Sequence, residues 1–320
     1  MAAFSDETLH TIHAARRYMQ PIFIDVVVYH KHCNDGTAAA WLAHKCLRGK
    51  VICIAADHAD FKDPDAWISE HPEITDKNIG FFDVTPSRSS LFVIWRHVKR
   101  TMILDHHITS ANEHVHTHGA FFDIGHSAAM LAWLYFQHGI ADVDPPKLIR
   151  YIEDRDIWKW NMPHSKAFSQ ALMMTPRTDP KTAFDKFIDT ENTSPQLVFL
   201  DSAIQELIAT GIPLMEHQEA QVIFISKAHV MAKIMGYNTA VVNSSTYMSE
   251  IGNYLSSQAG VDMALIWWWN HKTQLCHVSF RSNSDAVDVS KVAAAHGGGG
   301  HARAAGIRCS WPIEELFDKQ

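Results

Sequence analysis

From Pro21 to about Trp160, short apolar runs alternate with segments of helical periodicity. The apolar runs predict strands, the segments between them predict helices, and a turn-rich stretch surrounds Pro64. This alternation is typical of βαβ units with a parallel sheet. Two further helices follow, the second opened by prolines. The expected strands are 22–30, 51–56, 78–83 and 101–105, and the expected helices are 36–47, 87–97, 127–136 and 145–153.

The pattern changes after residue 185, where Thr193–Pro195 breaks the chain and 213–227 carries apolar residues at helical spacing. The remainder predicts a mixed sheet, with strands at 230–234, 239–243, 263–269, 275–281 and from 307, and helices at 247–257 and 288–295. A chain of 320 residues exceeds the usual size of one domain. We therefore expect an N-terminal extension (1–20), a parallel-sheet α/β domain (21–185), a helical linker (186–228) and a smaller mixed-sheet α/β domain (229–320).

Composition narrows the classes of protein. A net charge of −7 argues against an extended basic surface for long duplex nucleic acid, but a short anionic ligand remains compatible. Five cysteines without paired spacing argue against a disulfide scaffold and favour a reducing compartment. No run approaches the ~18 apolar residues of a membrane span, and no secretory segment opens the chain. We expect a cytoplasmic protein without a membrane partner.

Three of the expected strands end in side chains that can bind metals. The first ends in His30 and is followed by Asp35, the third ends in Asp83, and the fourth ends in Asp105 with two imidazoles directly behind it. The carboxyl ends of strands in open α/β sheets are where ligands bind. Oxygen and nitrogen donors of this kind suit hard or borderline divalent cations. The candidate ligands for two such cations are His30, Asp35, Asp83, His106 and Asp154.

Two cations about 3.5–4 Å apart can share a carboxylate, polarise a phosphoryl group and convert a water into hydroxide. Asp105 is expected behind them, accepting an imidazole N–H and fixing its tautomer. Each residue taken singly is also compatible with a helix cap or a turn. Cys33 is interpreted as a packing residue, because thiolate is a poor partner for hard cations.

A run of four glycines, Gly297–Gly300, leads into His301 and Arg303. Successive glycines let the backbone approach an anion and point N–H groups at it. A flexible linker is the alternative, but the run lies between an expected helix and an expected strand. The phosphate-binding candidates are Gly298, Gly299, Gly300, His301 and Arg303, with Arg281 and Ser282 as weaker ones. Trp267–Trp269 could stack on bases, although alternation along a strand favours a place in the core.

These motifs, in this order, resemble those of the DHH phosphoesterase superfamily with its accessory C-terminal domain, from Val26 to Ile307. The motifs are Tyr29–Gly36, Phe82–Asp83, Asp105–His107, Tyr151–Trp158 and Gly298–His301. The resemblance implies that 21–185 is the catalytic domain and 229–320 binds substrate. It implies one metal on His30, Asp35 and Asp83 and another on Asp83, His106 and Asp154. Manganese is the expected metal and magnesium the alternative.

By the same resemblance, His107 and Asp105 are the catalytic candidates: His107 contacts the phosphate or serves the leaving group. Many members carry a second aspartate where this chain has Thr37. The second metal site is therefore expected to be weaker, unless a nearby side chain compensates; the candidates are His32, Asp57 and His58.

The expected activity is hydrolysis of short single-stranded oligonucleotides or linear dinucleotides to nucleoside 5′-monophosphates. The alternatives are hydrolysis of a cyclic dinucleotide or a bisphosphorylated nucleotide, a pyrophosphatase, and a nucleotide-binding regulator with a decayed second metal site. The sequence leaves the oligomeric state open, a homodimer included.

Overall fold

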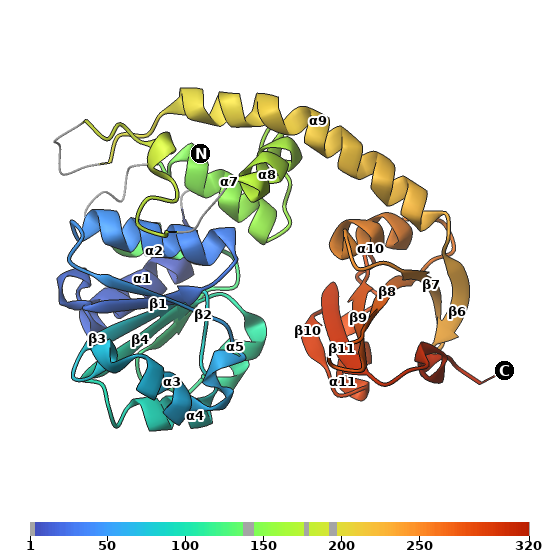
Figure 1. The fold of residues 1–320 in the computed structure, drawn as a ribbon, viewed down its shortest axis with the longest axis horizontal. Coiled ribbons are helices and arrows are strands. Elements are labelled where there is room, and N and C mark those ends of the chain that lie inside the picture. The colour runs from blue at the N-terminus through green and yellow to red at the C-terminus, as the bar shows by residue number, and fades with distance from the viewer. Residues whose placement is uncertain (1–3, 137–143, 176–178, 192–196, 320) are drawn as a thin grey trace. The chain divides into compact units, whose positions relative to one another are not determined.

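The computed structural model describes residues 4–136, 144–175, 179–191 and 197–319. The chain divides into two compact units, Met1–Leu214 and Met215–Gln320 (Figure 1). The division falls inside helix α9 (Asp201–Ser226), within the stretch that the sequence predicted as a helical linker. No helix in the described ranges is long and apolar enough to cross a membrane.

The first unit is built on a parallel sheet of five strands in the order β2-β1-β3-β4-β5. The direction of strand addition reverses at β1, which lies between β2 and β3, and such a switch point is where open α/β sheets bind ligands. The strands are β1 (Val26–His30), β2 (Ile52–Ala56), β3 (Asn78–Phe82), β4 (Arg100–Asp105) and β5 (Ala120–Phe122). The parallel sheet predicted from the alternating pattern is confirmed.

Helices cover both faces of this sheet. Val27 and Tyr29 of β1 pack into one core with α1, α2 and α6, whereas Val26 and Val28 pack into a second core with α3 and α4. Strand residues buried on both faces explain why these runs are apolar throughout. The helices of this unit are α1 (Asp6–Tyr18), α2 (Asn34–Cys46), α3 (Pro64–Glu70), α4 (Arg88–Ile94), α5 (Ile108–Glu113), α6 (Ala128–Phe136), α7 (Lys147–Asp156) and α8 (Ser165–Met174).

The sequence interpretation differs from the structure in several elements. The stretch expected as an N-terminal extension forms α1, whose Ile12 and Ala15 belong to the core. The turn-rich stretch contains α3, which begins at Pro64 and is capped by the Asp63 carboxylate on the Ala66 N–H. The first strand begins at Val26 and not at residue 22, because 21–23 form a 3₁₀ turn. Helices α5 and α8 and the short strand β5 are elements that the sequence pattern did not predict.

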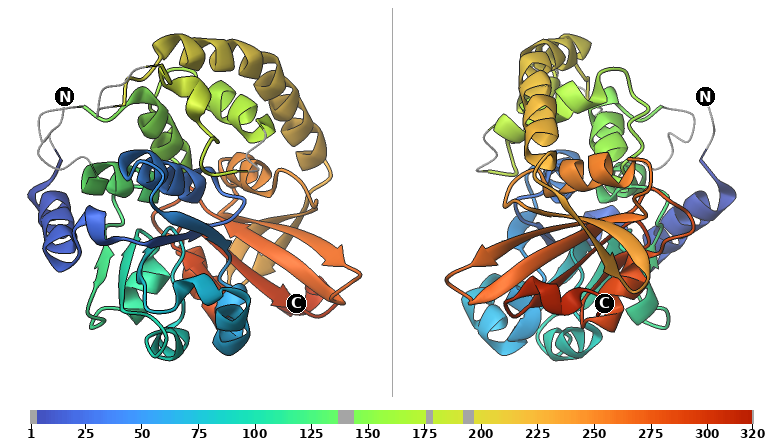
Figure 2. Two further views of the ribbon diagram at one scale, coloured as in Figure 1. Left: turned by 60° about the vertical axis from the view of Figure 1, so that its left-hand side comes forward. Right: turned by 90° about the vertical axis from the view of Figure 1, so that its right-hand side faces the viewer.

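The second unit is a mixed sheet of six strands in the order β10-β11-β9-β8-β7-β6, as the sequence predicted, seen from two further sides in Figure 2. Only β7 and β8 pair in parallel. Alternate residues of β8 face opposite cores, one shared with α10 and the other with α11. The elements are β6 (Val230–Ile234), β7 (Tyr237–Asn243), α10 (Met248–Ser256), β8 (Met263–Asn270), β9 (Leu275–Arg281), α11 (Val289–Ala295), β10 (Gly299–His301) and β11 (Ala304–Cys309).

Candidate metal centre

Four predicted ligands meet at the carboxyl ends of β1, β3 and β4. His30 ends β1, Asp83 follows β3 and His106 follows β4, while Asp35 comes from the first turn of α2. The His106 Nε2 atom lies 3.3 Å from Asp83 Oδ1 and 3.7 Å from Asp35 Oδ2. The His30 Nδ1 atom lies 3.5 Å from Asp83 Oδ2 on the other side of the same carboxylate. Asp83 thus stands between the two imidazoles, as a shared ligand would.

The backbone around the site is shaped to bring these groups together. A Cβ atom on Gly36 would lie 2.7 Å from the His30 carbonyl oxygen, so only glycine lets the start of α2 approach β1 this closely. Asp83 has a φ of +61°, in the left-handed region that aspartate tolerates better than most residues. Asp35 accepts hydrogen bonds from the Ala128 and Ala129 N–H groups, at 2.7 and 2.8 Å. The carboxylate of Asp35 is therefore oriented by the start of α6.

The structure places Asp156, and not the predicted Asp154, beside these ligands. The Asp156 Oδ2 atom lies 3.3 Å from His106 Nε2. The buried Asp154 carboxylate instead accepts hydrogen bonds from the Asn161 and Met162 N–H groups, at 2.7 and 3.1 Å. Residues two apart on an α-helix point about 200° away from each other, so only one of the two can face the site. The signal for Asp156 was present in the sequence, as the second aspartate of Glu153–Asp156.

Asp105 supports the imidazole of His107. Its Oδ1 atom lies 2.8 Å from His107 Nδ1 and accepts the His106 N–H, while Oδ2 accepts the Thr85 hydroxyl at 2.6 Å. Burial alone would raise the pKa of Asp105, but the hydrogen bond with His107 lowers it below its ordinary value. The ionised Asp105 therefore holds the proton of His107 on Nδ1. The ring nitrogen that can contact a substrate is then Nε2.

Three buried atoms of the cluster have no hydrogen-bond partner among the described residues: Asp83 Oδ2, His106 Nε2 and Asp156 Oδ2. Leaving a buried polar atom unsatisfied costs roughly 1–3 kcal/mol. Burial raises the pKa of Asp156 to about 6, and burial with the nearby Asp156 and Asp83 carboxylates raises the pKa of Asp35. A divalent cation among these donors would satisfy the unpartnered atoms and would also neutralise the buried negative charge. The residues therefore fit a metal site.

Cys33 lies beside two of the candidate ligands, His30 and Asp83. Its sulfur, a nitrogen of His30 and an oxygen of Asp83 all lie within 4.8 Å of one another. Burial, reinforced by the neighbouring carboxylates, raises the pKa of the Cys33 thiol well above its ordinary value. The group is therefore a neutral thiol, which is a poor ligand for a hard cation.

Thr37 is buried, and its hydroxyl donates to the Cys33 carbonyl oxygen at 2.6 Å inside α2. The residues suggested as compensating ligands, His32, Asp57 and His58, are absent from the metal-binding groups found among the described residues, whereas Asp156 belongs to one with Asp35 and His106. Asp156 is thus the carboxylate best placed to complete the second set of donors.

Replacing Thr37 by aspartate is expected to tighten the weaker of two metal-binding steps, because it adds a carboxylate at the first turn of α2. Calorimetric titration of the metal-free protein with Mn²⁺ should show two unequal steps in the parent. Thr37→Val is the control, since it also removes the hydroxyl bond to Cys33 but adds no ligand. Two equally tight steps in the parent, unchanged by the aspartate, would contradict this prediction.

The predicted phosphate-binding side chains of the second unit are mostly engaged within it. Arg281 donates to the Ser279 and Ser249 hydroxyls and to the Phe280 carbonyl. Arg303 donates to the Asn283 carbonyl and pairs with Asp285. Ser282 is buried, and its hydroxyl donates to the Asp262 carbonyl at 3.1 Å. Its predicted role as a phosphate ligand is therefore not supported, because its side chain closes a turn.

The last two glycines of the run, Gly299 and Gly300, begin the edge strand β10. A Cβ atom on Gly298 would lie 2.2 Å from the Gly306 carbonyl oxygen, and one on Gly300 would lie 2.5 Å from the Ala304 carbonyl oxygen. These two glycines are therefore required by the close approach of the chain to β11. Gly299 has open space around its Cα atom, and His301 is exposed at the end of β10. Anion binding by this run stays a prediction.

The tryptophans of β8 are partly buried, and Trp267 and Trp269 pack against the core that β8 shares with α11, in line with the alternation along the strand. Trp267 and Trp269 pack beside Trp311, with ring centroids 5.1 and 6.3 Å away. Trp268 stacks on His277 at 4.5 Å.

Both units of the chain are similar to known proteins. Residues 229–318 match the family model of the DHHA1 domain. The chain is 28% identical over 316 residues to the uncharacterized protein R106 of Acanthamoeba polyphaga mimivirus, covering 92% of this chain and 71% of that protein. It is 37% identical over 78 residues to oligoribonuclease NrnB of Bacillus subtilis, covering 24% of this chain and 18% of that protein.

Two solved structures share the fold. RecJ from Thermus thermophilus in complex with Mn²⁺ has a TM-score of 0.54 at 12% identity, over 99% of this chain and 54% of that one. The pGpG-specific phosphodiesterase PggH from Vibrio cholerae has a TM-score of 0.51 at 13% identity, over 91% of this chain and 94% of that one. The chain therefore shares its α/β fold with a nuclease and a phosphodiesterase. The second unit is a DHHA1 domain, and this match together with the similarity to oligoribonuclease NrnB supports the resemblance of the sequence motifs to the DHH phosphoesterases.

Proposed function

We propose that this protein is a metal-dependent phosphodiesterase that hydrolyses short single-stranded oligonucleotides or linear dinucleotides to nucleoside 5′-monophosphates. The observation that carries the proposal is the convergence of Asp35, Asp83, His106 and Asp156, with three unpartnered buried atoms, beside His107. The similarity to an oligoribonuclease and to a phosphodiesterase named for pGpG supports this class of substrate.

The metal ligands in this proposal are His30, Asp35, Asp83, His106 and Asp156. A bound divalent cation, Mn²⁺ first and Mg²⁺ as the alternative, would polarise the phosphoryl group and acidify a water. Asp105 keeps the Nδ1 proton of His107 in place, which turns Nε2 toward the substrate. His107 then binds the phosphate or serves the leaving oxygen, and Asp105 acts through it as a positioning residue.

A cavity of about 230 Å³ lies next to the carboxylates, with Asp35 and Asp156 in its wall. Its lining includes Arg155, whose guanidinium carbon lies 4.6 Å from the centroid of the Trp158 ring. The positive charge of Arg155 beside the acidic cluster favours an anionic substrate in this cavity. The cavity is smaller than typical ligand pockets of about 300–1,000 Å³. A cavity of this size supports a substrate that inserts only a small part of itself into the cavity.

An activity panel with Mn²⁺ and with Mg²⁺ tests the proposal. The substrates are di- to decanucleotides, a cyclic dinucleotide, a 3′,5′-bisphosphorylated nucleotide and pyrophosphate, and kcat/KM should be highest for the shortest oligonucleotides. A preference for the cyclic or bisphosphorylated substrate would favour those alternatives instead. A preference for pyrophosphate would contradict phosphodiester chemistry. Absence of turnover with all substrates and both metals would favour a nucleotide-binding regulator.

His301→Ala is expected to raise KM for dinucleotides by roughly 10- to 100-fold, because a hydrogen bond to a charged group contributes about 1.5–3 kcal/mol. An activated mononucleotide phosphodiester should be affected much less, since we propose that His301 binds a substrate phosphate without joining the chemistry. His271→Ala, an exposed histidine of the same unit, is the matched control. Equal losses on both substrates would indicate a catalytic role for His301.

The KM contrast reports binding only where KM approximates the dissociation constant. Binding of a non-hydrolysable dinucleotide should therefore weaken in parallel in His301→Ala. Unchanged binding of that analogue would refute the proposed role of His301.

A further inference from the structure

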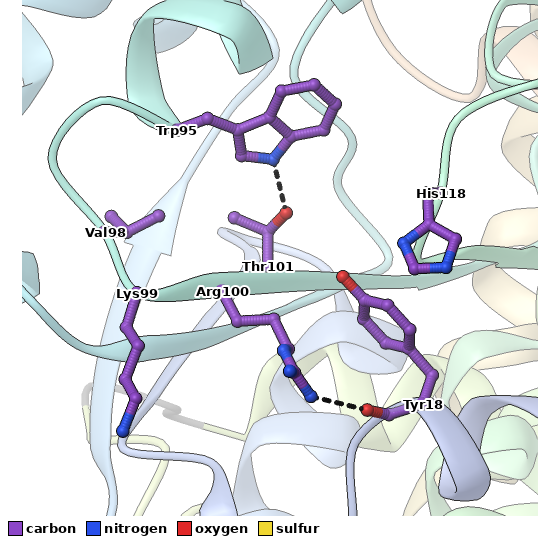
Figure 3. Close-up of a pocket in the computed structure, with 7 residues that line it drawn as sticks. All are labelled: Tyr18, Trp95, Val98, Lys99, Arg100, Thr101 and His118. Carbon is purple, nitrogen blue, oxygen red and sulfur yellow. Dashed lines mark hydrogen bonds between the residues drawn. The ribbon is translucent and has the colours of Figure 1, made fainter.

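A second polar pocket lies at the opposite end of β4 from the metal centre. Arg100 begins that strand, and Asp105 of the metal centre ends it. The pocket has a volume of about 450 Å³, within the range of small-molecule sites (Figure 3). Its lining includes Tyr18, Trp95, Lys99, Arg100, Thr101 and His118. An adjoining hollow shares Tyr18, Arg100 and His118 and adds Arg17.

The pocket carries positive charge that no carboxylate offsets. None of its described lining residues is acidic. Arg17, Lys99 and Arg100 form no ion pair with any carboxylate of the described residues. This concentration of cations stands out in a chain whose net charge is −7. Uncompensated cations in one concave place are suited to bind a phosphate group.

The cationic group at the centre of the pocket is held in position. An Arg100 guanidinium nitrogen donates to the Tyr18 carbonyl oxygen at 2.9 Å, near the carboxyl end of α1 (Figure 3). The guanidinium carbon also lies 5.4 Å from the centroid of the Tyr18 ring. This hydrogen bond to the helix end uses one of the five N–H donors of the Arg100 guanidinium. It also gives no structural reason for the positive charges of the neighbouring Lys99 and Arg17.

Apart from Val98 and Thr101, aromatic side chains form the rest of the wall. The Trp95 Nε1–H donates to the Thr101 hydroxyl at 2.7 Å, which fixes the indole (Figure 3). The Tyr18 ring meets the His118 ring edge-on, with centroids 4.8 Å apart. Gly119 has a φ of +86°, and a Cβ atom there would lie 2.7 Å from the Tyr18 ring. A side chain at this position would therefore displace Tyr18 from the pocket.

We infer that this pocket is a second nucleotide site, separate from the metal centre, which takes a nucleoside 5′-monophosphate. Arg100 and Lys99 bind the phosphate, and the aromatic wall of Trp95 and Tyr18 receives the base, because every base has a π-face that such rings can stack on. The site holds no carboxylate and needs no divalent cation. It goes beyond the proposed hydrolysis, and its existence does not depend on that activity.

Calorimetric titration of the full chain with adenosine 5′-monophosphate in the presence of EDTA tests this inference. One equivalent should bind, and Lys99→Glu should weaken the binding at least about tenfold, the effect of about 1.4 kcal/mol. Lys50→Glu is the matched control, since Lys50 is an exposed lysine before β2 at the same end of the sheet, outside the pocket. Asp83→Asn, which alters only the metal centre, should bind the nucleotide as the parent does.

The titrations distinguish binding at this pocket from binding at the metal centre. They also distinguish recognition of a nucleotide from binding of a simple anion. Ribose 5-phosphate and inorganic phosphate should each bind at least about tenfold more weakly than the nucleotide. Equal binding of inorganic phosphate would overturn the assignment of a nucleotide. No saturable binding at about 1 mM ligand, or equal weakening by Lys99→Glu and Lys50→Glu, would overturn the site. Loss of binding in Asp83→Asn would assign the nucleotide to the metal centre. Arg17→Glu provides a second variant, should Lys99→Glu lower the thermal stability.

Discussion

Asp83→Asn is expected to lower phosphodiester hydrolysis by roughly 10³-fold or more while leaving the fold intact. The Asp83 carboxylate lies between His106 Nε2 at 3.3 Å and His30 Nδ1 at 3.5 Å, so its loss affects both sets of donors at once. The asparagine keeps the shape of the side chain and removes the negative charge. Steady-state kinetics with a dinucleotide, on protein whose circular dichroism matches the parent, measures the effect.

Asp25→Asn is the matched control, because Asp25 accepts the Asn78 N–H at the amino end of the same sheet. Thermal unfolding gives a second readout that does not depend on activity. Mn²⁺ at about 100 times its dissociation constant should stabilise the parent by about 2.7 kcal/mol and the Asp83 variant much less. Activity above about a tenth of the parent in well-folded Asp83→Asn would refute its role as a shared ligand.

The second large effect is a contrast between two aspartates of α7. Asp156→Asn should abolish turnover and weaken metal binding without lowering the stability of the metal-free protein, because the buried Oδ2 atom of Asp156 faces His106 and accepts no hydrogen bond. Asp154→Asn should instead lower the free energy of unfolding by roughly 1.5–3 kcal/mol, since it weakens two charge-assisted hydrogen bonds to backbone N–H groups.

Denaturant unfolding in EDTA and calorimetric titration with Mn²⁺ measure the two sides of this contrast. Each variant serves as the control for the other, because both remove one carboxylate charge from the same helix. Loss of metal binding in a stably folded Asp154→Asn, with normal binding in Asp156→Asn, would restore the assignment expected from the sequence. Equal effects of the two substitutions on both measurements would contradict the division of roles.

The ends of the strands were predictable because a local pattern encodes them. An apolar run that stops at a polar residue marks the end of a buried strand, and parallel strands bring such ends to one edge. His30, Asp83 and His106 could therefore be assigned to one site from the sequence. Asp105 could be assigned to an imidazole, although only the structure identified His107 as the partner.

The choice between Asp154 and Asp156 was not predictable from local pattern. Both lie on one amphipathic helix, and the rotation of that helix about its axis depends on how Leu148, Ile149 and Ile152 pack in the core. The same holds for the glycine run, where the sequence predicted an anion site. The backbone of β11 decides that Gly298 and Gly300 can carry no side chain.

The sequence alone determined the α/β class, the parallel sheet and the motif order, because these follow from periodicities of two and 3.6 residues and from short contiguous motifs. Only the tertiary structure decided which side chains share a place when they are far apart in the chain. Tyr18, the pair Trp95 and Arg100, and His118 come from three separate segments and line one pocket. No local pattern relates them, because packing of α1 against the sheet creates their proximity.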